Sequence, residues 1–333
     1  MRRAWRGGLA RRAWRANALV AVVIVVVAAL LRGAPARAMD ATGTMGDGPG
    51  GGAVRERLAF SSAALGRPES YDIYLPAGYD DVANAGRCYP VLYLLHGSPG
   101  QPGDWVHGLH IQFMQDQGVA VGTLAPLIMV MPEGNGGVFR DSQYVNTRGG
   151  FRAEDAITRD LVGYVDGHYR TIANREARAI AGLSEGGYGA MNLGLKHPDI
   201  FGTIASVSGY FAADPAEVTR GNDPWGRDWA LMAANSPALY AGQLGALPDT
   251  HILIMDNTAD YPYAGDAARF DRILTHAHIA HTLLLQSLPG LAHGHSRAYW
   301  QMAFPIVLAY VAAHMPHPPA APVPAGYYIL PRR

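Results

Sequence analysis

Hydrophobic and polar residues follow two repeating patterns between about residue 54 and residue 314. Continuous apolar runs at 90–95, 125–131 and 201–207 are typical of strands that are buried on both faces of a sheet. Between such runs, apolar residues recur every three to four positions, and this spacing predicts helices. The expected strands are 54–60, 71–75, 90–95, 125–131, 177–181, 201–207, 251–255 and 282–285, and the expected helices are 154–169, 187–197, 266–276 and 296–314.

The order of these elements predicts the fold class. Strands that alternate with helices form mostly parallel sheets with helices on both faces, so we expect an α/β protein. The first two strands flank a turn-rich gap at 64–68 and are expected to pair antiparallel. Residues 211–250 are polar and irregular, and they predict a loop or a small cap. Ligands of such sheets bind beyond the carboxyl ends of the strands.

The two ends of the chain differ from this body. A basic start, an apolar run at 18–31 and an Ala-x-Ala site at 36–38 predict an export leader, either a cleaved signal peptide or an uncleaved N-terminal anchor. Either form places the body outside the cytoplasm, secreted or associated with the cell envelope, with membrane contact only through an uncleaved leader. The expected divisions are a leader at 1–38, a Gly-rich linker at 39–53, one α/β domain at 54–314 and a Pro-rich tail at 315–333.

Charge and cysteine content exclude several classes of protein. Eight of the 27 basic residues lie in 1–38, which holds no acidic residue, so the remainder carries 19 basic groups against 27 acidic ones. A mildly acidic body without a basic stripe argues against nucleic-acid binding. Cys88 is the single cysteine, which excludes an intramolecular disulfide and a cysteine metal cluster.

A Gly-x-Ser-x-Gly motif follows the apolar run at 177–181 and precedes small residues where a helix is expected. Such a motif predicts a nucleophile elbow, in which a strand turns sharply into a helix and the serine hydroxyl stays exposed. Gly182 and Gly186 are expected because a side chain there would collide with the neighbouring backbone. Ser184 is therefore the candidate nucleophile.

A serine hydroxyl needs a base within hydrogen-bond reach and a third group that orients the base. In this topology the chain order is serine, acid, histidine. The base is expected after the last strand, where His295 is preferred and His293 is the alternative. The acid is expected after 251–255, where Asp260 is preferred and Asp256 is the alternative.

The tetrahedral intermediate of acyl transfer needs two backbone N–H donors. One is expected from Glu185, which follows the candidate nucleophile, and the other from Ser98 in the loop after 90–95. Pro99 has no N–H and is excluded. The chemistry needs neither a metal ion nor an organic cofactor, and none is expected.

Together these motifs resemble the "Putative esterase" family of α/β-hydrolases, which contains esterase D, feruloyl esterases and the antigen 85 mycolyltransferases. The resemblance implies an α/β-hydrolase fold, a nucleophile at Ser184, a base at His295, which is followed five residues later by Trp300, and an acid at Asp260. It differs at Glu185, where the family commonly has methionine, and at Asn257, where glycine is usual. The matching stretches are 93–97 (YLLHG), 179–190 (AIAGLSEGGYGA), 197–201 (HPDIF), 207–209 (VSG), 295–296 (HS) and 299–300 (YW).

These features predict an exported serine hydrolase that cleaves carboxylic esters through an acyl-enzyme. The expected substrate is a small-molecule, glycan or lipid ester. One alternative is an acyltransferase of the mycolyltransferase type, which passes the acyl group to a sugar hydroxyl instead of water. The other is a non-catalytic binding protein on the same scaffold, because fold alone does not determine function.

Overall fold

The computed structural model describes residues 51–134, 142–148, 150–216, 224–260, 263–287 and 294–317, all within a compact unit formed by residues 49–333. The expected leader, nearly all of the linker and the tail from residue 318 onward lie outside the described residues. None of the helices in the described part combines the length and the apolar character of a membrane span.

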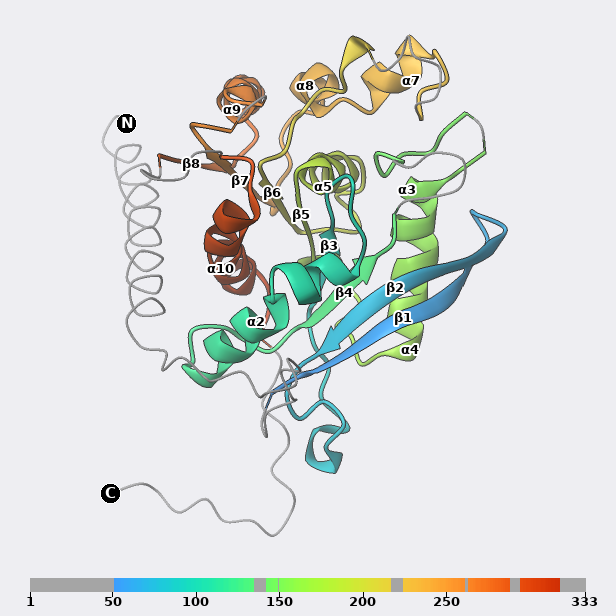
Figure 1. Ribbon diagram of the computed structural model, residues 1–333, viewed down its shortest axis with the longest axis vertical. Coiled ribbons are helices and arrows are strands. Elements are labelled where there is room, and N and C mark those ends of the chain that lie inside the picture. Colours follow the sequence, from blue (N-terminus) through green and yellow to red (C-terminus); the bar gives the residue numbers. More distant parts are fainter. Residues whose placement is uncertain are drawn as a thin grey trace, which may run out of the picture. The chain divides into compact units, whose positions relative to one another are not determined.

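One eight-stranded sheet runs through the described part, in the strand order β1-β2-β4-β3-β5-β6-β7-β8 (Figure 1). The pairs β1–β2 and β2–β4 are antiparallel and all other pairs are parallel. The predicted α/β class with a mostly parallel sheet is confirmed, and each expected strand forms. The strands are β1 (Ala53–Ser62), β2 (Arg67–Leu75), β3 (Val91–Leu95), β4 (Ile128–Pro132), β5 (Arg178–Leu183), β6 (Thr203–Val207), β7 (His251–Asn257) and β8 (Thr282–Gln286).

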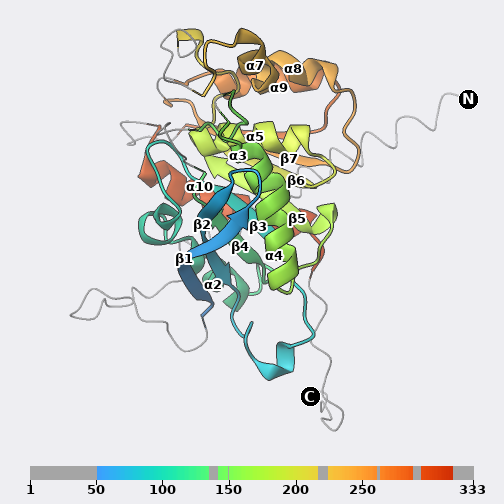
Figure 2. The ribbon, with the colours of Figure 1, turned by 90° about the vertical axis from the view of Figure 1, so that its right-hand side faces the viewer.

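Helices cover both faces of this sheet because its central strands are apolar on both sides. In β3, Val91 and Tyr93 belong to the large core cluster that also contains side chains from α4, α5 and α9, while Leu92 points to the opposite face. On that opposite face, α10 packs on the central strands and contacts α2. Figure 2 shows α4 and α5 lying across the strands. The longer helices are α2 (Ile111–Ala120), α4 (Val162–His168), α5 (Glu185–Lys196), α9 (Asp266–His276) and α10 (Arg297–His314).

Two helical segments differ from the sequence-based expectation. The helix expected at 154–169 is α3 (Ala153–Asp155), a π-helical stretch (Ala156–Leu161) and then α4. Helix α2 was not predicted at all. Its buried positions are Ile111, Gln115 and Gly118, which have helical spacing but include only one hydrophobic side chain. A pattern of hydrophobic residues therefore cannot reveal α2.

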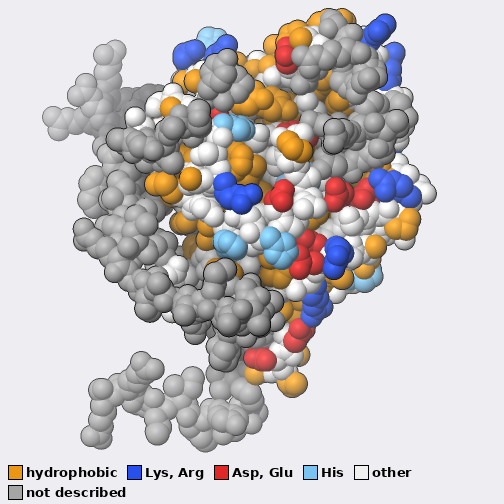
Figure 3. All heavy atoms as spheres, viewed as in Figure 1, with side chains coloured by type: hydrophobic (Ala, Val, Ile, Leu, Met, Phe, Trp, Pro, Cys, Tyr) orange, Lys and Arg blue, Asp and Glu red, His pale blue; other side chains and the backbone are white. Residues whose placement is uncertain are grey.

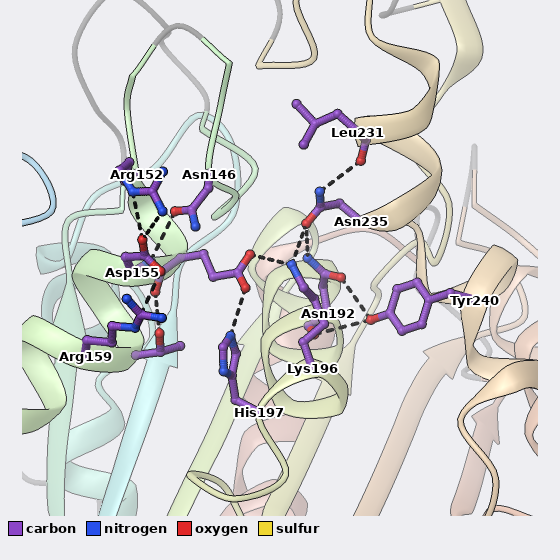
Figure 4. Close-up of polar contacts among 12 residues, drawn as sticks. Asn146, Arg152, Asp155, Arg159, Asn192, Lys196, His197, Leu231, Asn235 and Tyr240 are labelled. Atoms are coloured by element: carbon purple, nitrogen blue, oxygen red, sulfur yellow. Dashed lines mark hydrogen bonds and ion pairs between the residues drawn. The ribbon is translucent and has the colours of Figure 1, made fainter.

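The region expected to be irregular, 211–250, contains the short helices α7 (Trp229–Ala234) and α8 (Pro237–Tyr240), while 217–223 lie outside the described residues. A polar network joins this region to α5 and α3 (Figure 4). Glu154 accepts hydrogen bonds from Lys196 Nζ at 2.5 Å and His197 Nε2 at 2.8 Å. Lys196 also donates to Asn235 Oδ1 at 3.0 Å. Figure 4 shows Asn235 on the α7 side of Asn192 and Lys196, which lie on α5.

Candidate active site

The turn between β5 and α5 holds Ser184 in an unusual backbone conformation, with φ 54° and ψ −124°. A Cβ atom on Gly182 would lie 2.1 Å from the carbonyl oxygen of Gly186, and one on Gly186 would lie 1.9 Å from that of Leu95. Only glycine fits at these two positions, so the expected close approach of backbone is present. The strained turn is fixed by its surroundings, since Ser184 N donates to Val207 O at 2.9 Å.

A hydrogen-bonded chain of three side chains stands at the carboxyl ends of the parallel strands. Ser184 Oγ lies 2.8 Å from His295 Nε2, and His295 Nδ1 lies 2.8 Å from Asp260 Oδ1. Because a carboxylate only accepts, Nδ1 carries the hydrogen and Nε2 is left to accept from the serine hydroxyl. Asp260 is fully buried, whereas the imidazole side chain is 21% exposed. The arrangement can therefore deprotonate the serine and stabilise the charged imidazole.

Two residues, Asn257 and Gly294, shape the loop that carries Asp260. Asn257 Oδ1 accepts from Ala259 N at 2.8 Å, which closes an Asx turn immediately before the acid. A Cβ atom on Gly294 would lie 2.5 Å from Asp260 N, so only glycine lets the histidine loop approach the acid loop this closely. Asn257 thus builds the turn at a position where the family usually has glycine.

The imidazole also contacts an aromatic ring from α10. The ring of Trp300 meets the ring of His295 edge-on, with centroids 5.2 Å apart. Trp300 Nε1 donates to Ser208 Oγ at 3.2 Å. Ser208 is fully buried, and its N–H donates to Met255 O at 2.9 Å. Trp300 therefore connects the orientation of the imidazole to the end of β6.

Asp256, the alternative acid, is the penultimate residue of β7 and is 1% exposed. Its Oδ1 accepts from Asn257 N at 2.8 Å, and its carboxyl group hydrogen-bonds with Asp260. His295 contacts Asp260. Burial, followed by the hydrogen bond to and the charge of Asp260, raises the pKa of Asp256 to about 9.

The loop after β3 lies directly against the nucleophile. A Cβ atom on Gly97 would be 3.1 Å from Ser184 Cβ, and Ser98, one of the two predicted N–H donors, follows at once. The other predicted donor, Glu185, begins α5 and is 3% exposed. Tyr144 fixes this loop, because its hydroxyl donates to His96 O at 2.7 Å.

A series of tyrosine rings extends away from the imidazole. The rings of Tyr263 and His295 have centroids 5.4 Å apart, Tyr210 stacks on Tyr263 at 5.2 Å, and Tyr188 stacks on Tyr210 at 4.9 Å. Buried Trp225 belongs to the same cluster. Stacked tyrosine rings, the tyrosine wall, therefore lie beside the candidate base, and their outer members Tyr188 and Tyr210 are buried.

Sequence reasoning identified the three residues that the structure brings together, but it missed Tyr144 and the tyrosine wall. Tyr144 and Tyr263 lie in segments without periodic hydrophobicity, so no pattern indicated them. The alternative base His293 lies outside the described residues. In the ranges that the structure describes, no group of three or more His, Cys, Asp or Glu side chains could hold a metal ion.

Comparison with known proteins identifies the family. A family model described as "Putative esterase" matches residues 62–310. The chain is 31% identical over 158 residues to an endo-1,4-beta-xylanase/feruloyl esterase of Xylanibacter ruminicola, a match that covers 46% of this chain and 21% of that protein. It is also 31% identical over 150 residues to an esterase of Mycobacterium tuberculosis, covering 45% of this chain and 31% of that protein. The chain thus spans less than a third of these curated relatives.

Solved structures share the fold. A ferulic acid esterase superposes with a TM-score of 0.70 at 24% identity, covering 80% of this chain and 99% of the other. An S-formylglutathione hydrolase from Agrobacterium tumefaciens superposes with a TM-score of 0.66 at 18% identity, covering 80% and 96%. Both likenesses confirm the predicted α/β-hydrolase fold.

Proposed function

The chain belongs to the "Putative esterase" family, and on that premise we propose that it is a serine hydrolase that cleaves carboxylic esters through an acyl-enzyme on Ser184. One observation carries the proposal. Ser184, His295 and Asp260 form a continuous hydrogen-bonded chain, with both contacts at 2.8 Å, at the edge of the sheet where ligands of this architecture bind.

In the proposed acylation step, His295 Nε2 takes the hydroxyl proton while Ser184 Oγ attacks the ester carbonyl carbon. Asp260 keeps the imidazole in the required tautomer and stabilises its positive charge. The backbone N–H groups of Ser98 and Glu185 are proposed to bind the oxyanion of the tetrahedral intermediate. His295 then returns the proton to the departing alcohol, and water repeats the sequence to release the acid.

An aromatic acyl group is the substrate feature that we propose for this site. Aromatic rings pack well against one another, and Tyr263, which is partly exposed and stacked on buried Tyr210, lies beside His295. The relatives that are named feruloyl esterases support the same substrate class. Hydrolysis of methyl ferulate beside methyl acetate tests it, and equal kcat/KM values for the two esters would contradict it.

Hydrolysis of a p-nitrophenyl ester series from acetate to palmitate tests the mechanism. We expect Ser184→Ala and His295→Ala to lower kcat by about 10⁴-fold or more, and Asp260→Asn to cause a smaller but severe loss. Ser296→Ala is a matched control, because this serine adjoins His295 but caps α10, with its Oγ accepting from Tyr299 N. It should cost about 1 kcal/mol of stability and leave kcat within a few-fold. Full activity of Ser184→Ala would refute the proposal.

Two alternatives have direct tests. A fluorophosphonate probe that labels the wild type but not Ser184→Ala argues against a non-catalytic binding protein. Product analysis with and without trehalose separates hydrolysis from acyl transfer to a sugar, because only a transferase gives an acylated sugar. Both tests use the same purified protein.

Export is the remaining part of the proposal, and it rests on the sequence of residues 1–38. A cleaved leader predicts a secreted protein that begins at Met39, whereas an uncleaved anchor predicts full-length protein in the membrane fraction. N-terminal sequencing of the protein from each fraction distinguishes the two. On the face in Figure 3 acidic and basic side chains are interspersed, which supports the expectation that nucleic acid is not a partner.

A further inference from the structure

Two buried carboxyl groups share a hydrogen bond at the centre of the site. Asp256 is 1% exposed and Asp260 is fully buried. Two carboxyl groups that hydrogen-bond to each other need one proton between them, because two carboxylates can only accept. Burial makes a second negative charge at this distance still more costly. One of the two aspartates is therefore a neutral acid in the folded protein.

The remaining contacts decide which aspartate holds the proton. Asp260 Oδ1 accepts a hydrogen bond from His295 Nδ1 at 2.8 Å, so Asp260 acts as an acceptor in this contact. The other oxygen, Asp260 Oδ2, is buried, and among the described residues no N–H or hydroxyl donor bonds to it. A proton on Asp256 supplies the missing donor.

We propose that Asp256 is a positioning residue that stays protonated and donates its hydrogen bond to Asp260, which keeps Asp260 ionised and aimed at His295. This inference rests on the proposed function, in which His295 is the base. No bond is made or broken in this role, since the proton remains on Asp256 throughout the cycle. The sequence-based alternative, in which Asp256 is the catalytic carboxylate, is replaced by this arrangement.

The surroundings of Asp256 agree with a neutral group. Tyr299 on α10 has its hydroxyl buried near both aspartates, and burial followed by their charges raises the pKa of Tyr299. Asp266 on α9 adds negative charge, and its own partner is Arg269 of the same helix. His295 reaches the pair through Asp260 alone. No cation among these groups contacts Asp256, so of the groups named here only the N–H of Asn257 stabilises a carboxylate at this position.

Substitution by asparagine separates the two roles of Asp256. An asparagine side chain has the shape of a neutral aspartic acid and donates through its NH₂ group. We expect Asp256→Asn to retain kcat/KM within about three-fold near neutral pH, while Asp260→Asn loses orders of magnitude. Asp266→Asn is the control, because Asp266 adds negative charge near Asp256 without a hydrogen bond to it. This variant should have the same pH profile as the wild type. An Asp256→Asn variant as impaired as Asp260→Asn would overturn the proposal.

The pH profile gives a readout that a merely structural residue would not move. Wild-type kcat/KM, measured above the Ser184→Ala background, should fall as Asp256 loses its proton near pH 9. Asp256→Asn cannot ionise, so this alkaline fall should vanish. An alkaline limb unchanged in Asp256→Asn would overturn the proposal.

A stability measurement keeps this test separate from the proposed function. The folded-state pKa of Asp256 is raised, so its stabilising contribution is complete below the unfolded pKa and is lost as pH rises toward about 9. The melting temperature of Asp256→Asn minus that of the wild type should therefore increase as the pH rises from about 5 to about 9. If this difference in melting temperature did not change with pH, Asp256 would not be protonated in the folded protein, whether or not Ser184 is catalytic. If the Ser184→Ala variant kept full activity, by contrast, only the proposed function would be refuted.

Discussion

At the scale of single residues, the site depends on side chains that fix the imidazole from three directions. Ser184 lies on one side of His295, Asp260 on the second, and Trp300 on the third. Displacement of a catalytic group by about 1 Å can cost about 100-fold in rate, so groups that touch only the base still affect catalysis. Trp300 has this role, since it touches His295 and the end of β6 but not the nucleophile.

We expect Trp300→Phe to lower kcat about ten-fold with little change in KM, because phenylalanine keeps the ring contact but loses the N–H that binds Ser208 Oγ at 3.2 Å. Steady-state kinetics on one p-nitrophenyl ester measures it. The matched control is Trp229→Phe on α7, whose side chain is half exposed and away from the site. Equal kcat values for the two variants would show that the contact with Ser208 has no part in orienting the base.

At the scale of elements, the elbow is where the chain is least tolerant of added atoms. The backbone is packed closely where β5, α5 and the end of β3 come together. Gly182 and Gly186 occupy the two positions at which a side chain would collide with a neighbouring main chain. Overpacking at such a place displaces main chain, which side-chain rotation cannot relieve. The sequence indicated this element because glycine at both positions is what the geometry requires.

Gly186→Ala should prevent folding or cost several kcal/mol, since the new Cβ would lie 1.9 Å from Leu95 O. Gly163→Ala in α4 is the matched control, because a Cβ there meets nothing within 4 Å. It should stabilise the protein by about 0.5–1 kcal/mol through its better helix propensity. Urea unfolding of both variants measures the difference. A Gly186→Ala protein as stable as the wild type would contradict the steric account of the elbow.

At the scale of the whole molecule, the Glu154 network ties α3, α5 and the region of α7 and α8 into one body (Figure 4). Burial alone would raise the pKa of Glu154, but the hydrogen bonds from His197 and Lys196 and their charges bring it below its ordinary value. A lowered folded-state pKa stabilises the protein above the unfolded pKa of about 4.5, and this contribution is lost as pH falls through the folded value.

Glu154→Gln should lower the free energy of unfolding by about 2 kcal/mol at neutral pH, because two partly buried donors, Lys196 and His197, lose a charged partner. The deficit should shrink below about pH 4.5, where the wild type also loses the charge. Glu176→Gln is the control, since its side chain is 60% exposed and pairs with Arg175 at 3.7 Å, and it should change stability by less than about 0.5 kcal/mol. A deficit that is independent of pH would assign the effect to packing instead of charge.

The sequence by itself determined the strands and the family, and it predicted the three side chains that are proposed for the site. Buried strands and the glycines around Ser184 can be recognised in a short stretch of sequence. Burial restricts a strand to apolar residues, and close packing of the backbone restricts two positions to glycine. His295 and Asp260 could be located because each follows a strand whose end must lie at the same edge of the sheet.

Only the tertiary structure decided what depends on contacts between distant segments. Helix α2 is hidden because Gln115 and Gly118 occupy its buried face. The sequence left Asp256 and Asp260 open as the acid, since both come at the end of the same expected strand, and only the structure shows that the Asp260 carboxyl contacts His295. The tyrosine wall and the Glu154 network likewise join residues far apart in the chain. Their distance in sequence is the physical reason that no local pattern records them.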